Sequence, residues 1–182
     1  MNRYNFENFN TEKAINAVLY ISHKLKRNDF HKIFKILYFA DRSHISDYGR
    51  TITGDTYIAM TDGPVPSNIY DIFKSVRGDG FFKDEGNFSK FFEVVNWDLI
   101  NPLLEPNIKK LSKTDILHLN ESVEKYGELS WDKIREKSHD YAWQNTVKNT
   151  PISIENIAIE AGDSESYIDY LKEQMLLAKS FQ

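Results

Sequence analysis

The sequence predicts a mainly α-helical α+β fold with a small antiparallel β-sheet, built as one compact domain. Three observations lead to this prediction. Apolar residues recur at three- and four-residue spacings in several segments, which is the period of an amphipathic helix. The β-prone runs are few and short, and no linker rich in Gly, Pro or Ser divides the 182 residues. A chain of this length can bury a substantial core as a single domain.

Capping residues and helix breakers divide the chain into its expected elements. Helices are predicted over 11–27, 30–48, 67–76, 113–126, 131–137, 154–161 and 164–181, and short strands over 56–60 and 91–95. Ser or Asp residues precede most of these helices, where their side chains accept hydrogen bonds from free backbone N–H groups. The strand 91–95 is expected to pair with 56–60 or with the segment before Leu111, and residues 97–106 are expected to be a connection.

The helix 30–48 has a clear apolar face. Its apolar stripe consists of Phe30, Phe34, Leu37, Ile45 and Tyr48, while Lys35, Asp41 and most other charged residues fall off the stripe. Gly49 follows at once and is expected to end the helix in the left-handed conformation.

A rigid segment follows the strand 56–60. Gly63, Pro64 and Pro66 predict irregular structure over 62–66, because proline fixes φ and lacks a backbone donor. Ser67 is expected to cap the next helix. Residues 1–10 are expected to lie extended against the body of the domain.

Four ordered segments of this region are distinctive: KILYFADR (35–42), YGR (48–50), TGDTY (53–57) and GPVPS (63–67). Together they resemble the Panacea domain family, which contains SocA-like antitoxins and the phage-associated GepA proteins. The resemblance is strong over the core motif 30–73 and extends more thinly to about residue 162, so the chain is expected to be one Panacea-like domain over 1–182.

This resemblance implies an antitoxin that neutralises its cognate protein toxin by direct binding. The toxin is expected to be encoded by an adjacent gene. Two alternatives stay open: an adaptor that delivers a toxin to a Clp-type protease, as in the SocA branch, and a phage-associated accessory protein without a toxin. Many relatives carry an additional DNA-binding module, and its absence from this sequence argues against autoregulation.

Ten residues are the expected toxin-binding or family-motif positions. They are Tyr38, Asp41, Arg42, Tyr48, Arg50, Asp55, Tyr57, Pro64, Pro66 and Tyr70. Tyr and Arg beside a rigid proline segment are residue types of interface hot spots. A purely structural interpretation places Tyr38 and Tyr57 in the core and pairs Arg50 with Asp41 or Asp55.

No catalytic residue, metal or cofactor is expected. Asp41, His44 and Asp47 lie on one helical face at three-residue spacing, but one helix supplies too few ligands for a metal. An enzyme remains the competing hypothesis, and it requires Asp41, His44, Arg50 and Asp55 to converge in a pocket with perturbed pKa values.

Composition and charge give expectations about the cellular compartment of the protein and the kind of partner that it binds. The absence of Cys fits a reducing cytoplasm, and no apolar run reaches the roughly 18 residues of a membrane span. The whole net charge of −4 lies in residues 151–182, which hold six acidic and two basic side chains. The acidic helix expected over about 164–181 would repel phosphates, so no direct nucleic-acid binding is expected, and a basic protein would be attracted to it.

Overall fold

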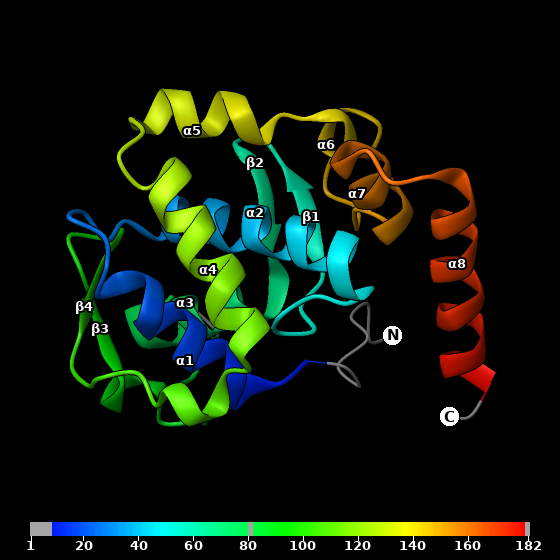
Figure 1. Ribbon diagram of the computed structural model, residues 1–182. Helices are drawn as coiled ribbons and strands as arrows, with labels where there is room; N and C mark the ends of the chain where they lie inside the picture. Colours follow the sequence, from blue (N-terminus) through cyan, green and yellow to red (C-terminus); the bar gives the residue numbers. More distant parts are fainter. Residues whose placement is uncertain (1–8, 80–81, 181–182) are drawn as a thin grey trace.

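Helix α2 (Phe30–Tyr48) occupies the centre of the computed structural model, which describes residues 9–79 and 82–180 (Figure 1). Around it pack α1 (Thr11–Ser22), α4 (Lys113–Tyr126), α5 (Trp131–Ser138), α7 (Ile154–Ala161) and the strand β2 (Gly63–Pro66). Eleven of its 19 residues are buried, and these include Lys35, Asp41 and His44. Lys35 and Asp41 lie off the predicted apolar stripe and are buried all the same, because other elements cover the middle turns of α2 on all sides.

The predicted fold class is confirmed. Over the described residues the chain forms eight α-helices and two antiparallel sheets of two strands each, in a single compact domain. The remaining elements are β1 (Tyr57–Met60), α3 (Ser67–Arg77), β3 (Phe92–Val95), β4 (Leu99–Pro102), α6 (Tyr141–Gln144), α8 (Glu165–Ser180) and the 3₁₀ turns Phe88–Lys90 and Ile108–Lys110. Across 9–79 and 82–180, every helix is too short or too polar to cross a lipid bilayer.

The proline segment is a strand, so its prediction as irregular structure is wrong. β2 pairs antiparallel with β1, with Tyr57 opposite Pro66 and Ala59 opposite Pro64. The other edge of β1 is bonded to a later segment, where Ala59 N donates to Thr150 O at 3.0 Å. β2 is thus an edge strand, and an edge strand tolerates proline because half of its backbone groups need no partner in the sheet.

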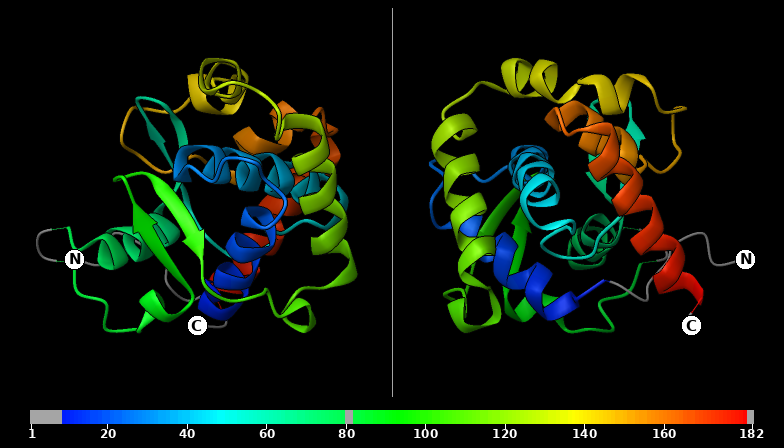
Figure 2. Two further views of the ribbon diagram at one scale, coloured as in Figure 1. Left: turned by 90° about the vertical axis from the view of Figure 1, so that its left-hand side faces the viewer. Right: turned by 45° about the vertical axis from the view of Figure 1, so that its right-hand side comes forward.

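The second hairpin joins β3 to β4 (Figure 2, left). Both partners expected for 91–95 are wrong, and the first part of the expected connection 97–106 is in fact β4. The turn uses Asn96 at φ 50° and Trp97 at φ 69°. Tight hairpin turns require positive φ and normally carry Gly or Asn there. Because Trp occupies position 97, the sequence lacks this hairpin signal.

Most predicted helix ends are confirmed. The side chains of Asp29, Ser130 and Ser153 accept the expected capping hydrogen bonds, and Ser112 forms a capping box with Asp115. The first helix, however, ends at Ser22 and does not reach residue 27. The expected path of residues 1–8 and the expected end of the last helix at Phe181 lie outside the described residues.

Helix α8 packs across the C-terminal end of α2 (Figure 1). The Tyr167 hydroxyl donates to the Ile45 carbonyl at 2.9 Å, and Leu171 lies against Gly49. Gly49 has φ 69° and closes α2 as predicted, through a hydrogen bond from its N–H to Ile45 O. Because a Cβ on Gly49 would come within 3.1 Å of Leu171, this glycine serves both the helix end and the contact with α8.

Replacing Gly63 by Ala should destabilise the fold. Gly63 has φ 99°, and an added Cβ would lie 2.3 Å from Ser138 Oγ and 3.0 Å from Lys35 Cε. We expect Gly63→Ala to lower the free energy of unfolding by about 3 kcal/mol, from backbone strain and overpacking together. Urea unfolding measures this. Gly78→Ala is the matched control, because Gly78 also has positive φ but open space around it, and it should cost only about 1 kcal/mol. Equal losses in the two variants would show that the close packing at Gly63 is unimportant.

Candidate functional site

Asp41 fastens α2 to the first hairpin. Its carboxylate accepts a hydrogen bond from the Tyr57 hydroxyl at 2.6 Å and another from the Ile52 backbone N–H at 2.5 Å. Complete burial raises the pKa of Asp41 to about 6, although both hydrogen bonds oppose this shift. Asp41 and Tyr57 therefore act as a buried internal pair and present nothing to solvent.

Asp55 supplies the N-terminal cap of α3 from a distance. Its carboxylate accepts from the backbone N–H groups of Asn68 and Ile69, at 3.0 and 2.9 Å, and from the Asn68 side chain. The residue in the capping position is Pro66, which makes no side-chain cap. The prediction that Ser67 caps this helix is therefore wrong, and an acidic side chain at the positive end of the helix dipole takes that role.

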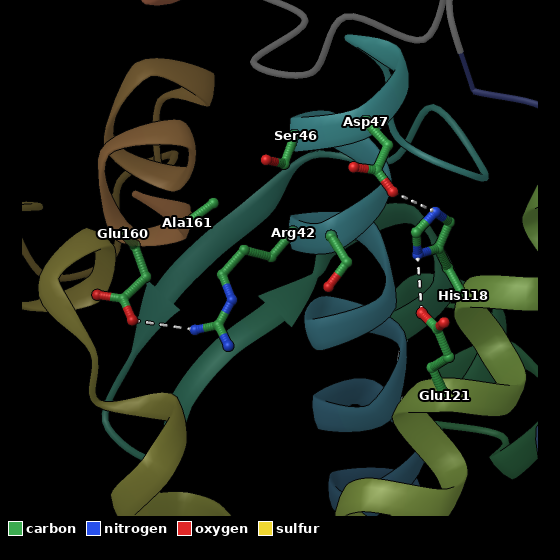
Figure 3. Close-up of a pocket in the computed structure, with 8 residues that line it drawn as sticks. Arg42, Ser46, Asp47, His118, Glu121, Glu160 and Ala161 are labelled. Carbon is green, nitrogen blue, oxygen red and sulfur yellow. Dashed lines mark hydrogen bonds and ion pairs between the residues drawn. The ribbon is translucent and has the colours of Figure 1, made fainter. Parts of the chain in front are cut away.

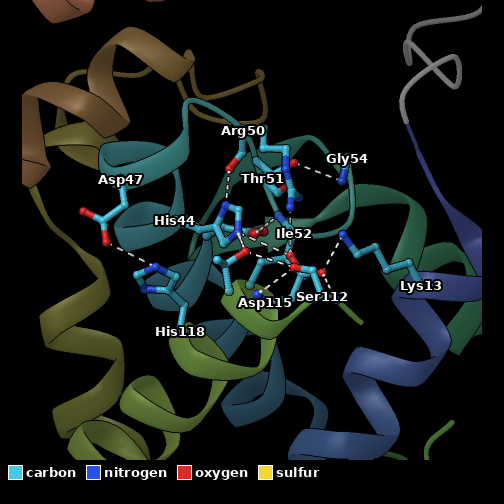
Figure 4. Close-up of polar contacts among 12 residues, drawn as sticks. Lys13, His44, Asp47, Arg50, Thr51, Ile52, Gly54, Ser112, Asp115 and His118 are labelled. Atoms are coloured by element: carbon cyan, nitrogen blue, oxygen red, sulfur yellow. Dashed lines mark hydrogen bonds and ion pairs between the residues drawn. The ribbon is translucent and has the colours of Figure 1, made fainter. Parts of the chain in front are cut away.

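Asp115 gathers three cationic or polar groups at the end of α2 (Figure 4). Its carboxylate lies 2.6 Å from Lys13 Nζ, 3.2 Å from Arg50 Nη2 and 3.3 Å from His44 Nε2. The other ring nitrogen of His44 is 2.9 Å from the Arg50 carbonyl. Burial acts to raise the pKa of Asp115, but the hydrogen bonds from His44, Lys13 and Ser112 outweigh it and hold the pKa well below its usual range. The expected pairing of Arg50 with Asp41 or Asp55 is wrong.

Asp140 is the partner of two further predicted residues. The Tyr38 hydroxyl donates to its carboxylate at 2.9 Å, and Arg42 Nη1 lies 3.1 Å from the same carboxylate and from Glu160. Burial and then the neighbouring Asp140 raise the pKa of Tyr38 well above its ordinary value, so its hydroxyl remains a donor. This cluster ties α2 to the segment before α6 and to α7.

The prolines and Tyr70 complete the packing on the other side of α2. Lys35 is fully buried, and its ammonium donates to the Pro64 carbonyl at 2.7 Å. Burial lowers the pKa of Lys35 to about 7. Tyr70 packs its ring against Phe30 and Phe34, with ring centres 6.0 and 5.8 Å apart.

Only part of the predicted set reaches the surface. Tyr38, Asp41, Asp55, Tyr57, Pro64 and Pro66 are buried. Tyr48 is 49% exposed, although its place on the apolar stripe predicted burial, and the Arg50 side chain is 47% exposed. Arg42 and Tyr70 are partly exposed. In this structure a partner can touch Tyr48 and Arg50 directly, whereas the buried residues support the surface from behind.

Of the four residues of the enzyme hypothesis, His44 and Arg50 meet at Asp115, while Asp41 and Asp55 have other partners. Asp41 faces Tyr57, His44 faces Arg50 and Asp115, and Asp55 faces α3, so each is paired within the fold. Among the described residues, no group of three or more His, Asp and Glu side chains is placed to hold a metal ion.

A protein-family model for the antitoxin SocA-like Panacea domain matches residues 33–144. The chain belongs to the SocA-like Panacea domain family. The Panacea match begins in the first turn of α2 and ends with α6, so it contains all ten residues discussed above, while α1, α7 and α8 lie outside it. No curated protein and no solved structure matches the chain.

Sequence reasoning missed the acidic partners of this site. The Ser112–Asp115 spacing predicts only a capping box, and no sequence pattern links Asp140, Glu160 or His118 to α2. Each lies about 70 or more residues after the side chain that it contacts on α2. Local spacing carries no signal for such pairs. The capping-box position of Asp115 marked a fixed carboxylate, but nothing in the sequence indicated that three groups would meet there.

The raised pKa of Asp41 should make stability depend on pH. The unfolded chain releases the Asp41 proton near pH 4 and the folded chain near pH 6, so this group stabilises the fold at low pH and the contribution is lost as pH rises through about 6. Asp41→Asn does not titrate. Between pH 4 and 7 we therefore expect the unfolding free energy of the wild type to fall by about 2 kcal/mol relative to the variant.

Urea unfolding of both proteins at several pH values measures this difference. His31, whose burial lowers its pKa to about 4, changes stability in the opposite sense, but it does so in both proteins and cancels in the comparison. Parallel pH profiles would contradict the assignment to Asp41.

Replacing Asp115 by Asn should be strongly destabilising. The change removes the negative charge shared by Lys13, His44 and Arg50, and His44 is fully buried. We expect a loss on the order of 3 kcal/mol in thermal or urea unfolding. Asp98→Asn is the control, because Asp98 is 46% exposed and lies 3.9 Å from Arg27, and it should cost less than about 1 kcal/mol. A loss at Asp115 no larger than that of the control would show that the network is dispensable.

Proposed function

We propose that this chain is an antitoxin that binds its cognate protein toxin directly and covers the toxin's active surface. The family match over residues 33–144 carries the proposal. The internal pairing of the polar residues on α2 is consistent with it, because a protein that neutralises by binding needs a stable surface and no reactive groups of its own. The toxin is expected to be the product of an adjacent gene.

The candidate contact surface surrounds the C-terminal end of α2. We call it the α2 end surface and define it by Tyr48, Arg50, Leu117 and Tyr170, from α2, the following turn, α4 and α8. Tyr48 and Leu117 are 49% and 48% exposed, and the Tyr48 ring packs 5.8 Å from the ring of His118, the neighbour of Leu117. Tyrosine and arginine are enriched among residues that dominate binding energy.

Two contacts within the fold hold the α2 end surface in place. Asp115 fixes Arg50, and the hydrogen bond from Tyr167 to Ile45 fixes the start of α8 against α2. A surface that is already ordered loses little conformational entropy when a partner docks. The buried family-motif residues thus favour binding without touching the partner.

Charge supports a basic partner. Residues 151–182 carry a net charge of −4, and Glu165 and Asp169 are exposed on α8 beside Tyr170. An acidic surface attracts and steers a basic protein, and it repels nucleic acid. We therefore expect the toxin to present a basic surface to this protein.

Co-expression with the product of each adjacent gene tests the proposal. We expect one such product to inhibit growth when expressed alone, and this chain to restore growth and co-purify with it. Restored growth with loss of the toxin and no stable complex would instead favour delivery to a Clp-type protease. A harmless neighbour that forms no complex would contradict the antitoxin proposal and favour a phage-associated accessory role.

Truncating the α2 end surface should weaken the complex without unfolding the antitoxin. We expect the double substitution Tyr48→Ala with Leu117→Ala to reduce affinity at least tenfold, because each removes an exposed apolar contact. Leu103→Ala with Leu104→Ala is the matched control, since these leucines are 49% and 48% exposed in the segment after β4. Calorimetry measures affinity and thermal unfolding checks the fold. Equal affinity in the two double variants would place the interface elsewhere.

A further inference from the structure

A polar pocket of about 370 Å³ lies between α2, α4 and α7 (Figure 3). The side chains that matter are Arg42, Ser46, Asp47, His118, Glu121 and Glu160. The family resemblance pointed to only one of them, Arg42. The pocket borders the α2 end surface, because the ring of Tyr48 packs 5.8 Å from the ring of the lining residue His118.

The pocket has an excess of negative charge. Its three carboxylates, Asp47, Glu121 and Glu160, face one guanidinium, so its lining has a formal charge of −2 when His118 is neutral. The guanidinium of Arg42 is already neutralised, because its Nη1 lies 3.1 Å from both Asp140 and Glu160. The side chains of Asp47 and Glu121 are each 59% exposed, and within residues 9–79 and 82–180 neither has a Lys or Arg partner; each pairs only with His118. The uncompensated charge therefore sits at the open side of the pocket.

The His118 ring lies between these two carboxylates, and neither of its nitrogens forms a hydrogen bond with the described residues. The residue is 3% exposed, and its ring nitrogens lie 3.2 Å from Asp47 and 3.4 Å from Glu121 (Figure 3). Neither contact has the geometry of a hydrogen bond. A neutral imidazole carries a single N–H, so at least one of the two contacts then brings a ring lone pair against a carboxylate. A donor from outside would relieve this arrangement.

A second buried acceptor without a hydrogen bond belongs to Asp163, the partner of the lining residue Ser46. Ser46 donates to Asp163 Oδ1 at 2.5 Å, while the other carboxylate oxygen, Oδ2, is buried without a hydrogen bond. Unmade hydrogen bonds at buried polar atoms are uncommon in folded proteins, so each one needs a physical explanation. The carboxylate oxygens of Asp47 and Glu121 and the lone pair of a neutral His118 are all acceptors, so this place favours a cationic donor.

We infer that this pocket receives an arginine side chain of the bound toxin. The inference rests on the proposed function and identifies the chemistry of its contact. Asp47 and Glu121 approach from facing helices, and a planar guanidinium with five donors can bond both at once, whereas a lysine ammonium acts as a point charge. An anionic ligand is excluded by the three carboxylates. The pocket thus anchors a basic partner next to the exposed Tyr48 and Leu117.

A small-molecule titration tests the pocket without the toxin. The full chain, labelled with ¹⁵N, is titrated with N-acetyl-arginine amide, and N-acetyl-citrulline amide serves as the control because it has nearly the same shape and no charge. We expect saturable shifts of the His118 ring and the Ala161 amide with arginine only. The double variant Asp47→Asn with Glu121→Gln should lose these shifts. Their absence in the wild type, or equal shifts with citrulline, would overturn the inference.

The second measurement uses the toxin complex. We expect Asp47→Asn with Glu121→Gln to weaken toxin binding at least tenfold at low salt, with a smaller dependence on salt than the wild type shows. Glu105→Gln with Glu128→Gln is the control, since both carboxylates are far more exposed and lie outside the pocket. Unchanged toxin affinity in the first double variant would overturn the inference and leave the antitoxin function standing. If no adjacent product binds the wild type, the proposed function fails, and the arginine titration alone decides the pocket.

Discussion

The burial of α2 is the constraint on which the rest of the fold depends. This helix carries Lys35, Asp41 and His44 in its buried face, and an unpaired polar or charged group in that position would cost several kcal/mol. Each therefore needs a partner from another element. Pro64 accepts from Lys35, Tyr57 and Ile52 donate to Asp41, and Asp115 meets His44. These contacts fix the position of the first hairpin, the turn after α2 and α4 relative to the central helix.

The same constraint explains what the family-motif residues do. Asp41, Asp55 and Tyr57 form hydrogen bonds that hold the hairpin and α3 in place, so their contribution to any partner contact is indirect. Their chemistry resembles that of catalytic groups because buried carboxylates and tyrosines have shifted pKa values wherever they occur. Structural networks perturb pKa values as active sites do. In this structure Asp41, Asp55 and Tyr57 are each hydrogen-bonded within the fold.

Because the polar groups of α2 are paired inside the fold, the exposed groups near the ends of α2, α4 and α8 are the ones available to a partner. The pocket and the α2 end surface lie where elements inside the Panacea match meet α7 and α8, which lie outside it. The excess negative charge at this place and in residues 151–182 supports the proposal of a basic partner.

The sequence by itself determined the helices, most of their caps and the α+β class, because these depend on local spacing and on side chains that bond their own backbone. It also indicated the family through four ordered segments. Only the tertiary structure decided that Pro64 and Pro66 lie in an edge strand, that Arg50 belongs to Asp115, and that Tyr48 is exposed while Asp41 is buried. The physical reason is that these outcomes depend on partners distant in sequence, whose meeting is set by how the elements pack around α2.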